Sequence, residues 1–452
     1  MYNKISRIHL IGIGGIGMSG IAELLIRHGY IVSGSDLNRG ESVRYLETLG
    51  IKVFQGHSAP NVDGAELVVF SSAIRNENPE YSEALKKQIP TISRAEMLAE
   101  LMRIKYGIAV AGAHGKTTTT SMISTVLVEA GLDPTIVVGG RVDNFGGTNA
   151  RLGSGEFMVV EADESDGSFN RLSPSIAIVT NIDREHMDYY KSMRRVRKAF
   201  ESFLNKVPFY GLSVICGDDP SLKLMSHRIE RRKRTYGFSP ENTYRVLGYA
   251  VKDTGTECAI EAAGHKETLR LRVPGKHNVL NALAALAVAD ELSIPREQSL
   301  KGLSLFQGVQ RRFQKRGEKN GVTFIDDYAH HPSEISATLA AAREQYPKSK
   351  IRVVFQPHRY SRVEDLFDQF ATCFKNCDEV AITEIYAAGE TPIPGVQSEV
   401  LVEQMCREGL GATRYFQKPI EGVENWLKKS AAGDVIITLG AGDLPNVYRN
   451  LF

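Results

Sequence analysis

Two glycine-rich turns, each placed between an apolar strand and a helix, constrain the fold more than any other feature of the 452-residue sequence. The first covers residues 12–17 (GIGGIG), and the second covers residues 112–118 (GAHGKTT). Glycine lets main-chain N–H groups approach an anion, and the N-terminus of the following helix favours negative charge. Such turns are typical of parallel α/β sheets, which bind ligands at the carboxyl ends of their strands. The sequence therefore predicts an α/β protein with two anion-binding loops.

Strand and helix signals alternate in three segments of the chain. They occupy residues 1–105, 106–313 and 314–452. At about 100–200 residues per domain, a chain of this length has room for two to four domains. Two weaker strand runs are expected around residues 244–273. We therefore expect three α/β domains with these boundaries.

Composition excludes several classes of protein. Lys and Arg number 55 and Asp and Glu number 53, which gives a formal charge of +2 and no polybasic surface for nucleic acid or an anionic membrane. No uninterrupted apolar run approaches the roughly 18 residues of a membrane span, and the N-terminus predicts a first strand instead of a secretion signal. The five cysteines are scattered, as in a reducing compartment. We expect a cytoplasmic protein that binds neither nucleic acid nor membrane.

Residues 12–17 satisfy the G-x-G-x-x-G pattern, and Asp36 ends the strand that follows. An acidic residue at that distance commonly bonds a ribose hydroxyl. Taken alone, the pattern indicates a dinucleotide site for a nicotinamide or flavin cofactor. A nucleotide-linked substrate offers the same diphosphate, so both kinds of ligand remain open at this loop.

The second loop departs from the strict Walker A pattern, because Val110 occupies the place of its first glycine. What remains is G-x-x-G-K-T between a strand and a helix. Lys116 can supply positive charge to the β- and γ-phosphates, and the Thr117 hydroxyl can bind Mg²⁺. This combination predicts an ATP site.

Carboxylates gather after two strands of the second segment. Residues 161–166 (EADESD) carry four acids, and residues 181–188 (NIDREHMD) place His186 among others. Acids this close repel one another unless a cation lies between them. We expect Mg²⁺ bound with ATP, and His186 is a candidate ligand. The alternatives are an exposed acidic loop and a histidine in an ordinary polar loop.

Two polar runs follow strands of the third segment, at residues 326–332 (DDYAHHP) and 356–362 (QPHRYSR). Arg359 and Arg362 are three positions apart, so on a first helical turn they point the same way. Paired guanidinium groups can bind a carboxylate through parallel hydrogen bonds. The spacing predicts a carboxylate site, with a salt-bridged surface pair as the alternative.

Together the motifs of this chain resemble the Mur ligase family, and they occur in family order from residue 7 to about residue 443. The motifs are GIGGIGMSGIA, AGAHGKTTTT, EADESD, NIDREHMDYY, PGKHNVLNALAA, GVQRRF, DDYAHHP, QPHRYSR and IYAAGE. The resemblance implies a Rossmann-like first domain, a P-loop ATPase-like central domain and a Rossmann-like last domain. Within the family, GIGGIGMSG, and HHP with QPHRYSR, resemble the alanine-adding member.

The resemblance implies an ATP-dependent amide ligase of peptidoglycan precursor synthesis. The carboxylate of UDP-N-acetylmuramate would attack the γ-phosphate of ATP, and the amine of L-alanine would then attack the acyl phosphate. The implied partners are therefore UDP-N-acetylmuramate, L-alanine and ATP. The implied cofactor is Mg²⁺, or Mn²⁺ in its place, as two ions. A monomer or weak homodimer is expected.

The resemblance also assigns roles to individual residues. The implied catalytic residues are Lys116, Glu161, His186 and His330. The implied ATP contacts are Gly112, Ala113, His114, Gly115, Lys116, Thr117, Thr118, Asn278, Asn281, Arg312 and Asp327. The UDP-sugar is expected at Gly12, Gly14, Gly15, Ile16, Gly17, Asp36 and Ser71. L-alanine is expected at Tyr328, His330, Arg359 and Arg362. The implied metal ligands are Thr117 and Glu161 for one ion and His186 for the second.

One position departs from the family pattern, because Ala113 stands where the family usually has threonine. Its main-chain N–H remains, so we expect the ATP loop to survive. No lysine follows His186 at the spacing of a carbamylated metal ligand, and none is predicted. Three alternatives are weighed against the resemblance: an NAD-dependent oxidoreductase, a nucleotide-regulated binding module without chemistry, and another amide ligase of the same fold that uses a different amino acid, a recycled peptide or folate.

Overall fold

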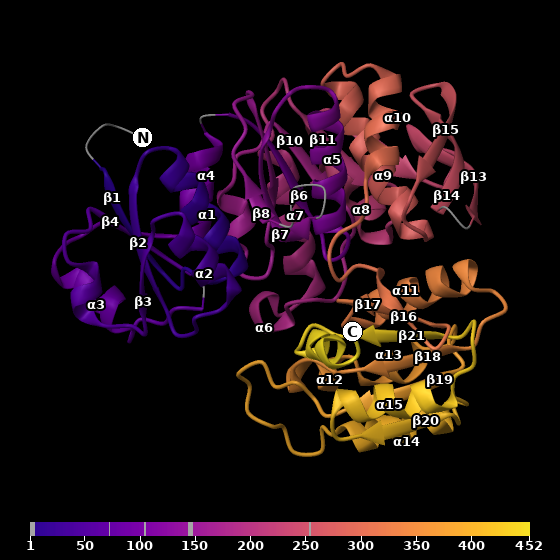
Figure 1. Cartoon of the computed structure of the whole chain (residues 1–452). Helices are drawn as coiled ribbons and strands as arrows, with labels where there is room; N and C mark the ends of the chain where they lie inside the picture. The colour runs from indigo at the N-terminus through magenta and orange to yellow at the C-terminus, as the bar shows by residue number, and fades with distance from the viewer. Residues whose placement is uncertain (1–4, 72, 104, 143–147, 253–254) are drawn as a thin grey trace. The chain divides into compact units, whose positions relative to one another are not determined.

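The computed structural model describes residues 5–71, 73–103, 105–142, 148–252 and 255–452. The chain forms two compact units. The first contains the described residues up to Gly248 with Cys258–Arg270 and Leu280–Phe306, and the second contains Tyr249–Glu257, Leu271–Val279 and Gln307–Phe452. Three β-sheets, each accompanied by helices, build these units, which confirms the α/β class (Figure 1). The boundaries between the three expected domains, after residues 105 and 313, stay a prediction.

The first sheet is parallel throughout. Its strands lie in the order β3 (Lys52–Gln55), β2 (Ile31–Asp36), β1 (Arg7–Ile11), β4 (Leu67–Phe70) and β5 (Thr91–Ser93). Its helices are α1 (Ile16–Arg27), α2 (Glu41–Thr48), η1 (Ala59–Val62), α3 (Pro79–Lys86) and α4 (Arg94–Met102). The chain builds outward from β1 to β3 and then returns to the other side of β1, and ligands of such sheets bind where the order reverses.

Register places three polar segments at the carboxyl edge of this sheet. Ile11 at the end of β1 is level with Ser35 in β2 and with Phe70 at the end of β4. The glycine-rich turn, Asp36 and Ser71 therefore emerge side by side. The first turn of α1 follows directly, and this helix buries its apolar residues at Met18, Ile21 and Leu25, three and four positions apart.

The second sheet has ten strands. Their order is β15 (His265–Leu271), β14 (Gly255–Ala262), β13 (Tyr244–Lys252), β12 (Lys233–Gly237), β11 (Leu212–Cys216), β10 (Ile176–Val179), β6 (Tyr106–Ala111), β9 (Phe157–Glu161), β7 (Thr135–Val142) and β8 (Thr148–Arg151). The helices along this part of the chain are α5 (Lys116–Glu129), η3 (Ser168–Arg171), α6 (Met187–Tyr190), α7 (Met193–Asn205), α8 (Pro220–Met225), η4 (Ser226–Arg228), α9 (Lys276–Glu291) and α10 (Arg296–Leu305).

Residues 244–271 form three strands where two runs were expected. The unexpected break comes between β14 and β15, at Ala263 and Gly264, which have φ angles of 50° and 88°. Two successive residues with positive φ are typical of the tightest hairpin turns, which usually show asparagine or glycine at both positions. Alanine at the first position hides this turn from the sequence.

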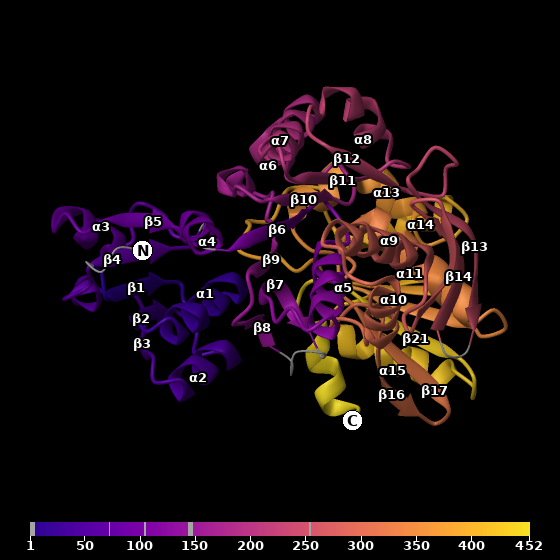
Figure 2. The same ribbon diagram turned by 90° about the horizontal axis from the view of Figure 1, so that it is seen from above.

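Helix α5 packs on β6, β7 and β9 and on α10 (Figure 2). It is rich in hydroxyl residues and yet buried along most of its length. Four of the hydroxyls donate to the main-chain carbonyl four residues earlier, at 2.7–2.8 Å, from Thr120, Ser121, Ser124 and Thr125. These bonds satisfy four of the buried hydroxyls inside the helix itself, so this part of the polar run behind the ATP loop can lie in the core; Thr119 Oγ1 is buried without a hydrogen-bond partner among the described residues.

The third sheet lies in the second unit. Its strands are β16 (Gln314–Lys319), β17 (Val322–Asp327), β21 (Val435–Leu439), β18 (Ile351–Phe355), β19 (Glu379–Thr383) and β20 (Thr413–Phe416), in that order. Only the pairing of β16 with β17 is antiparallel among those described. The helices are α11 (Pro332–Gln345), α12 (Tyr360–Asp365), α13 (Phe367–Thr372), α14 (Ser398–Arg407), α15 (Pro419–Lys429) and η5 (Leu444–Asn450).

Register again brings the polar segments of this sheet to one edge. Asp327 at the end of β17 and Phe355 at the end of β18 are both level with Leu439 at the end of β21. The two segments that follow β17 and β18 therefore flank the end of β21. Within the described ranges, no helix is both long and apolar enough to cross a membrane.

Candidate active site

The first glycine-rich loop is fixed by the end of β2. Gly12, with φ of 78°, and Ile13 both donate their N–H groups to the Ser35 carbonyl, at 2.8 and 3.0 Å. Gly14 donates to Asp36 Oδ2 at 2.9 Å, and a Cβ on Gly14 would lie only 2.9 Å from the same oxygen. The Asp36 carboxylate therefore holds the loop itself, and its second oxygen accepts the Asn38 N–H at 3.0 Å.

The other residues expected at the UDP-sugar lie along the same loop. Ser71 follows β4 and donates its N–H to the Ile11 carbonyl at 3.2 Å. A Cβ on Gly12 would stand 3.2 Å from Ser71 Cβ, so these two residues are neighbours. Gly15 precedes α1, whose first residue is Ile16. A Cβ on Gly17 would lie 2.6 Å from an Arg94 guanidinium nitrogen, so a side chain there would displace the end of Arg94.

The second loop joins β6 to α5 and is held by the residues that follow β10. Gly112 has φ of 132°, and a Cβ there would lie 2.1 Å from Thr180 Oγ1. Thr180 Oγ1 and Asn181 Nδ2 both donate to the His114 carbonyl, at 2.6 and 2.9 Å. Ala113 donates its N–H to the Asn181 carbonyl at 3.2 Å. The loop therefore keeps its shape through main-chain bonds that need no hydroxyl at position 113.

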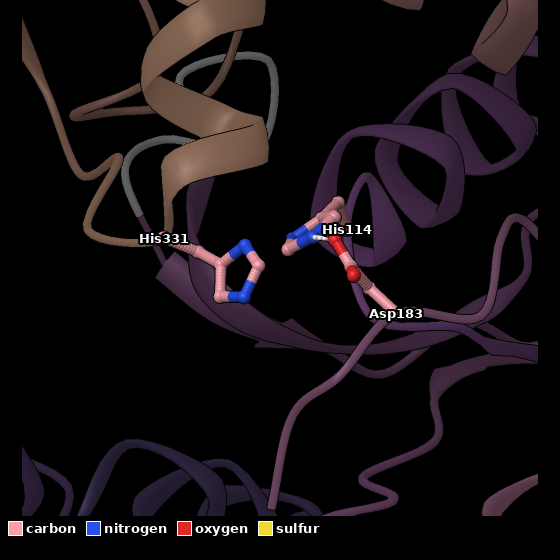
Figure 3. A group of neighbouring side chains, drawn as sticks. All are labelled: His114, Asp183 and His331. Atoms are coloured by element: carbon pink, nitrogen blue, oxygen red, sulfur yellow. Dashed lines mark hydrogen bonds and ion pairs between the residues drawn. The ribbon is translucent and has the colours of Figure 1, made fainter. Parts of the chain in front are cut away.

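The His114 ring is fixed by a second contact with the same segment. Its Nε2 lies 2.9 Å from Asp183 Oδ2 (Figure 3). The loop is thus attached at its main chain and at its one aromatic side chain to the residues after β10. Such an arrangement holds the loop amides in place before a nucleotide arrives.

Lys116 opens α5 and points back over the loop. Its ammonium donates to the carbonyls of Gly112 and Ala113, at 2.6 and 3.1 Å, and to Glu164 Oε1 at 2.8 Å. Burial lowers the pKa of Lys116, but Glu164 and the neighbouring carboxylates raise it further than burial lowers it. The ammonium therefore stays charged at neutral pH, where the γ-phosphate of ATP would need it.

Three metal-binding side chains converge beside this lysine. Ligand atoms of Glu164, Glu185 and His186 all lie within 4.8 Å of one another. His186 Nε2 is 3.7 Å from Glu164 Oε1 and 3.8 Å from Glu185 Oε2. Burial raises the pKa of Glu164 to about 7, although Lys116 opposes the rise. The two carboxylates are the kind of ligand that Mg²⁺ and Mn²⁺ prefer, and the imidazole adds a nitrogen donor beside them.

The expected ligands of the first ion, Thr117 and Glu161, lie near Lys116. Glu161, at the end of β9, is level with Val110 in β6 and accepts the Gly139 N–H at 2.7 Å. Its charge acts on Lys116. Thr117 and Thr118 are buried in the first turn of α5, next to Lys116. Asn281 also lies at this loop, because a Cβ on Gly115 would stand 2.8 Å from its Oδ1.

The second unit carries the remaining candidates for ATP contacts. Asp327 accepts the N–H groups of Phe313 and Ala329, both at 2.7 Å, and burial raises its pKa to about 6. Arg312 donates to Glu334 at 3.2 Å. Asn278 donates from its amide to the Pro274 carbonyl at 2.7 Å. Each of these three side chains therefore makes at least one hydrogen bond to another residue of the same unit.

The four residues expected at L-alanine are joined by two that were not expected, His358 and Tyr386. The Tyr328 and His330 rings have centroids 5.2 Å apart, and the His330 and His358 rings have centroids 5.8 Å apart. His358 stacks on Tyr386 at 5.6 Å with an interplanar angle of 11°. The segments after β17, β18 and β19 therefore meet in one group of rings.

Two arginines, Arg359 and Arg362, lie beside this group of rings. Arg362 donates to His358 Nδ1 and to the His358 carbonyl, both at 3.2 Å. Burial, His330 and the guanidinium groups of Arg362 and Arg359 lower the pKa of His358 to about 3, so this imidazole is neutral and accepts at Nδ1. Arg359 has φ of 69°, and its buried Nε has no hydrogen-bond partner within the described residues. An unpartnered buried guanidinium nitrogen suits an anionic ligand.

His330 is oriented by its own loop. Its Nδ1 lies 2.9 Å from the Tyr328 carbonyl, which can only accept, so Nδ1 carries the proton and the neutral ring has its lone pair on Nε2. Glu334 accepts the His330 N–H at 3.1 Å and lies 3.4 Å from Nδ1. The ring is therefore prepared to accept a proton at Nε2.

Family models match nearly the whole chain. Residues 7–106 match the Mur ligase family catalytic domain, residues 110–289 match the Mur ligase middle domain, and residues 311–442 match the glutamate ligase domain of Mur ligases. The chain belongs to the Mur ligase family. This confirms the family resemblance that the motifs indicated.

Individual Mur ligases resemble this chain over its full length. A UDP-N-acetylmuramate–L-alanine ligase of Geobacter sp. (strain M21) is 50% identical and covers 100% of this chain and 98% of its own. The crystal structure of a UDP-N-acetylmuramate–alanine ligase from Thermotoga maritima has a TM-score of 0.83 at 33% identity, covering 98% of this chain and 97% of its own. A murein peptide ligase from Psychrobacter arcticus shares the fold, with a TM-score of 0.72 at 21% identity, covering 99% and 98%.

Proposed function

We propose that this Mur ligase joins L-alanine to UDP-N-acetylmuramate at the expense of ATP. The observation that carries the proposal is the setting of Lys116, a charged lysine on a preformed phosphate loop, faced by Glu164 and two further metal-binding side chains. The names of the relatives that are about half identical support the choice of substrates. ATP dependence is general in the family, and peptidoglycan precursor synthesis is the corresponding role.

The proposed reaction has two steps. A carboxylate oxygen of the muramyl lactate attacks the γ-phosphorus of ATP, and the bond from phosphorus to the oxygen of ADP breaks. The amine of L-alanine then attacks the acyl carbon, and phosphate leaves as the amide forms. The first step places negative charge on the phosphoryl oxygens and the leaving ADP, and the second places it on the acyl oxygen of the tetrahedral intermediate and then on the leaving phosphate, so fixed positive groups dominate catalysis. Lys116 and the amides of the loop supply such groups.

The amine must lose a proton before or during its attack. His330 Nε2 is proposed to accept it, because its Nδ1 proton is committed to the Tyr328 carbonyl. Arg359 and Arg362 are proposed to hold the alanine carboxylate beside the ring group, and Tyr328 to form one wall of that site. Arg312, Asp327, Asn278 and Asn281 remain proposed contacts to ATP.

Mg²⁺ supplies charge neutralisation at the phosphates and can be replaced by Mn²⁺. We propose two ions, one held by Thr117 and Glu161 and one held by His186. The donor atoms around His186 add Glu164 and Glu185 to the second set. Glu164 would leave Lys116 for the cation when ATP binds, which exposes the ammonium to the γ-phosphate.

Replacing His186 with alanine is expected to raise the Mg²⁺ concentration needed for half-maximal phosphate release by about tenfold or more, because one ligand of the proposed set is lost. Asp188→Asn is the matched control, since this exposed carboxylate lies two residues away and outside the cluster. The measurement is a Mg²⁺ titration of phosphate release. An unchanged Mg²⁺ dependence for His186→Ala would remove the second ion from the proposal.

The first glycine-rich loop is proposed to bind the diphosphate of the UDP-sugar. The alternative, a nicotinamide cofactor, leaves the ATP loop without a role. Calorimetry with the full chain separates the two: UDP-N-acetylmuramate should bind in the micromolar range, corresponding to about −8 kcal/mol, and NAD should not bind detectably. Tight NAD binding without UDP-sugar binding would overturn the proposed function.

The coarser organisation of the molecule completes the proposal. We propose domain boundaries after residues 105 and 313, a cytoplasmic location in a bacterium, and a monomer or weak homodimer as the working form. A murein peptide ligase, from Psychrobacter arcticus, shares this fold. The identity of the amino acid that stimulates phosphate release distinguishes that activity from the proposed one.

A further inference from the structure

A buried carboxylate lies behind the first glycine-rich loop, outside every motif of the sequence. Glu80, in the first turn of α3, is inaccessible to solvent, and so is His9 in β1. Glu80 Oε2 is 3.6 Å from His9 Nε2 and 3.3 Å from His57 Nδ1. Asn61 donates to Glu80 Oε1 at 2.5 Å, and Ser35 donates to Glu80 Oε2 at the same distance. Four side chains from three separate segments of the chain thus converge on one carboxyl group.

The hydrogen bonds outweigh the cost of burial. Burial raises the pKa of Glu80, but the nearby His9 ring and the hydrogen bonds from Ser35 and Asn61 lower it to about 2. Glu80 is therefore a carboxylate at neutral pH, although it has no Lys or Arg contact among the described residues. Burying an isolated charge costs free energy of folding. A buried carboxylate of this kind is therefore expected where its hydrogen bonds fix a backbone conformation that apolar packing alone would not fix.

One partner of Glu80 leads directly to the nucleotide loop. The Ser35 side chain donates to Glu80, and the Ser35 carbonyl accepts the N–H groups of Gly12 and Ile13. The next residue, Asp36, accepts the Gly14 N–H. Ser35 and Asp36 together thus hold three consecutive residues of the loop through hydrogen bonds. Glu80 in turn holds the Ser35 side chain, on the side that faces the core.

We propose that Glu80 is a positioning residue for nucleotide-diphosphate binding: it acts through Ser35 to hold the main-chain amides of the first loop where the diphosphate of the substrate binds. This rests on the proposed function, which puts the UDP-sugar at that loop. Glu80 itself touches no substrate in this account. Its loss should weaken binding of the uridine nucleotide and leave the separate ATP loop unaffected.

The test is calorimetry of the full-length protein with UDP as the probe, together with the KM for UDP-N-acetylmuramate, the KM for ATP and the melting temperature. Glu80→Gln is expected to raise the Kd for UDP and the KM for UDP-N-acetylmuramate by roughly tenfold, because the loop is no longer held in its binding geometry. The KM for ATP and kcat at saturation should change by less than about twofold. Ser35→Ala removes the hydroxyl through which Glu80 acts, together with its 3.0 Å contact to His57 Nδ1, and should raise the Kd for UDP by a comparable factor.

Ala84→Gly is the matched control for lost stability. Ala84 is fully buried in the same helix as Glu80 and contacts neither Ser35 nor the loop through any hydrogen bond. It should lower the melting temperature and leave the Kd for UDP unchanged. If Glu80→Gln and Ser35→Ala bind UDP as the wild type does, or if Ala84→Gly loses equal affinity at an equal melting temperature, the positioning role is overturned. A wild-type protein that binds ATP and no uridine nucleotide would overturn the proposed function itself.

Discussion

Replacing Lys116 with alanine is expected to lower phosphate release by at least about a thousandfold, which corresponds to roughly 4 kcal/mol of transition-state stabilisation. Its ammonium is the cation that points over the ATP loop, and it is held there by two carbonyls and Glu164. The measurement is phosphate release at saturating substrates. Activity within about tenfold of the wild type would contradict the assignment of this loop to ATP.

Two effects of Lys116→Ala must be told apart: a lower stability of the fold and a lower rate of phosphate release in the folded protein. Removing one member of a buried ion pair leaves the other uncompensated, here Glu164. Its raised pKa, about 7, limits the cost, because the carboxyl can take up a proton. The double variant Lys116→Ala/Glu164→Gln should recover melting temperature and remain inactive. Lys105→Ala is the matched control, since Lys105 donates to two main-chain carbonyls, of Gly153 and Gly155, and should keep its activity.

Replacing Arg359 with alanine is expected to raise the KM for L-alanine by about tenfold or more, as the loss of a charged hydrogen bond of roughly 1.5–3 kcal/mol implies. Its buried Nε has no partner within the described residues, so the side chain has a bond to offer to a carboxylate. Arg362→Ala should act in the same direction and also release His358. The KM for UDP-N-acetylmuramate should hardly change in either variant.

Arg343→Ala serves as the control for these arginines. Arg343 lies in the same unit, where it binds the Ser349 carbonyl and Asp378 at 2.8 and 2.7 Å, away from the ring group. It should lose some stability and keep the KM for L-alanine. If both site variants instead lose affinity for the UDP-sugar and keep that for alanine, the amino-acid site has been assigned to the wrong part of the chain.

The positions that the sequence could predict are those whose geometry is set by their near neighbours. Gly112, Gly115 and Lys116 belong to one turn between a strand and a helix, so their arrangement follows from local backbone conformation. The α/β class follows from the same alternation, and the family follows from the order of the motifs. For this reason the loops could be identified before any three-dimensional contact was known.

Other parts of the site depend on contacts between distant segments. The sequence shows four acids in EADESD, but which of them meets Lys116 depends on how the chain bends after β9, and Glu164 takes that place. The role of Asp36 in holding Gly14 depends on the register of β1 with β2. Glu185 precedes His186 in the segment after β10, and β10 pairs with β6 on the side opposite to β9, so the order of the strands was the signal that could have added Glu185 to the site.

The residues with no sequence signal are those that a pattern cannot distinguish from ordinary surface positions. Glu80 stands in a polar stretch, and only tertiary packing brings it to His9, Ser35, His57 and Asn61. Tyr386 lies in a segment about thirty residues after His358, and their stacking depends on the neighbouring positions of β18 and β19. Long-range contacts of this kind are what the structure adds.

The most direct test of the account is phosphate release from ATP by the full-length protein with UDP-N-acetylmuramate against a panel of single amino acids and short peptides. Phosphate release should require both UDP-N-acetylmuramate and an amino acid, with L-alanine giving the largest kcat/KM and a product whose mass is that of the substrate plus alanine minus water. Release that needs no amino acid, or that a peptide stimulates while L-alanine does not, would contradict it.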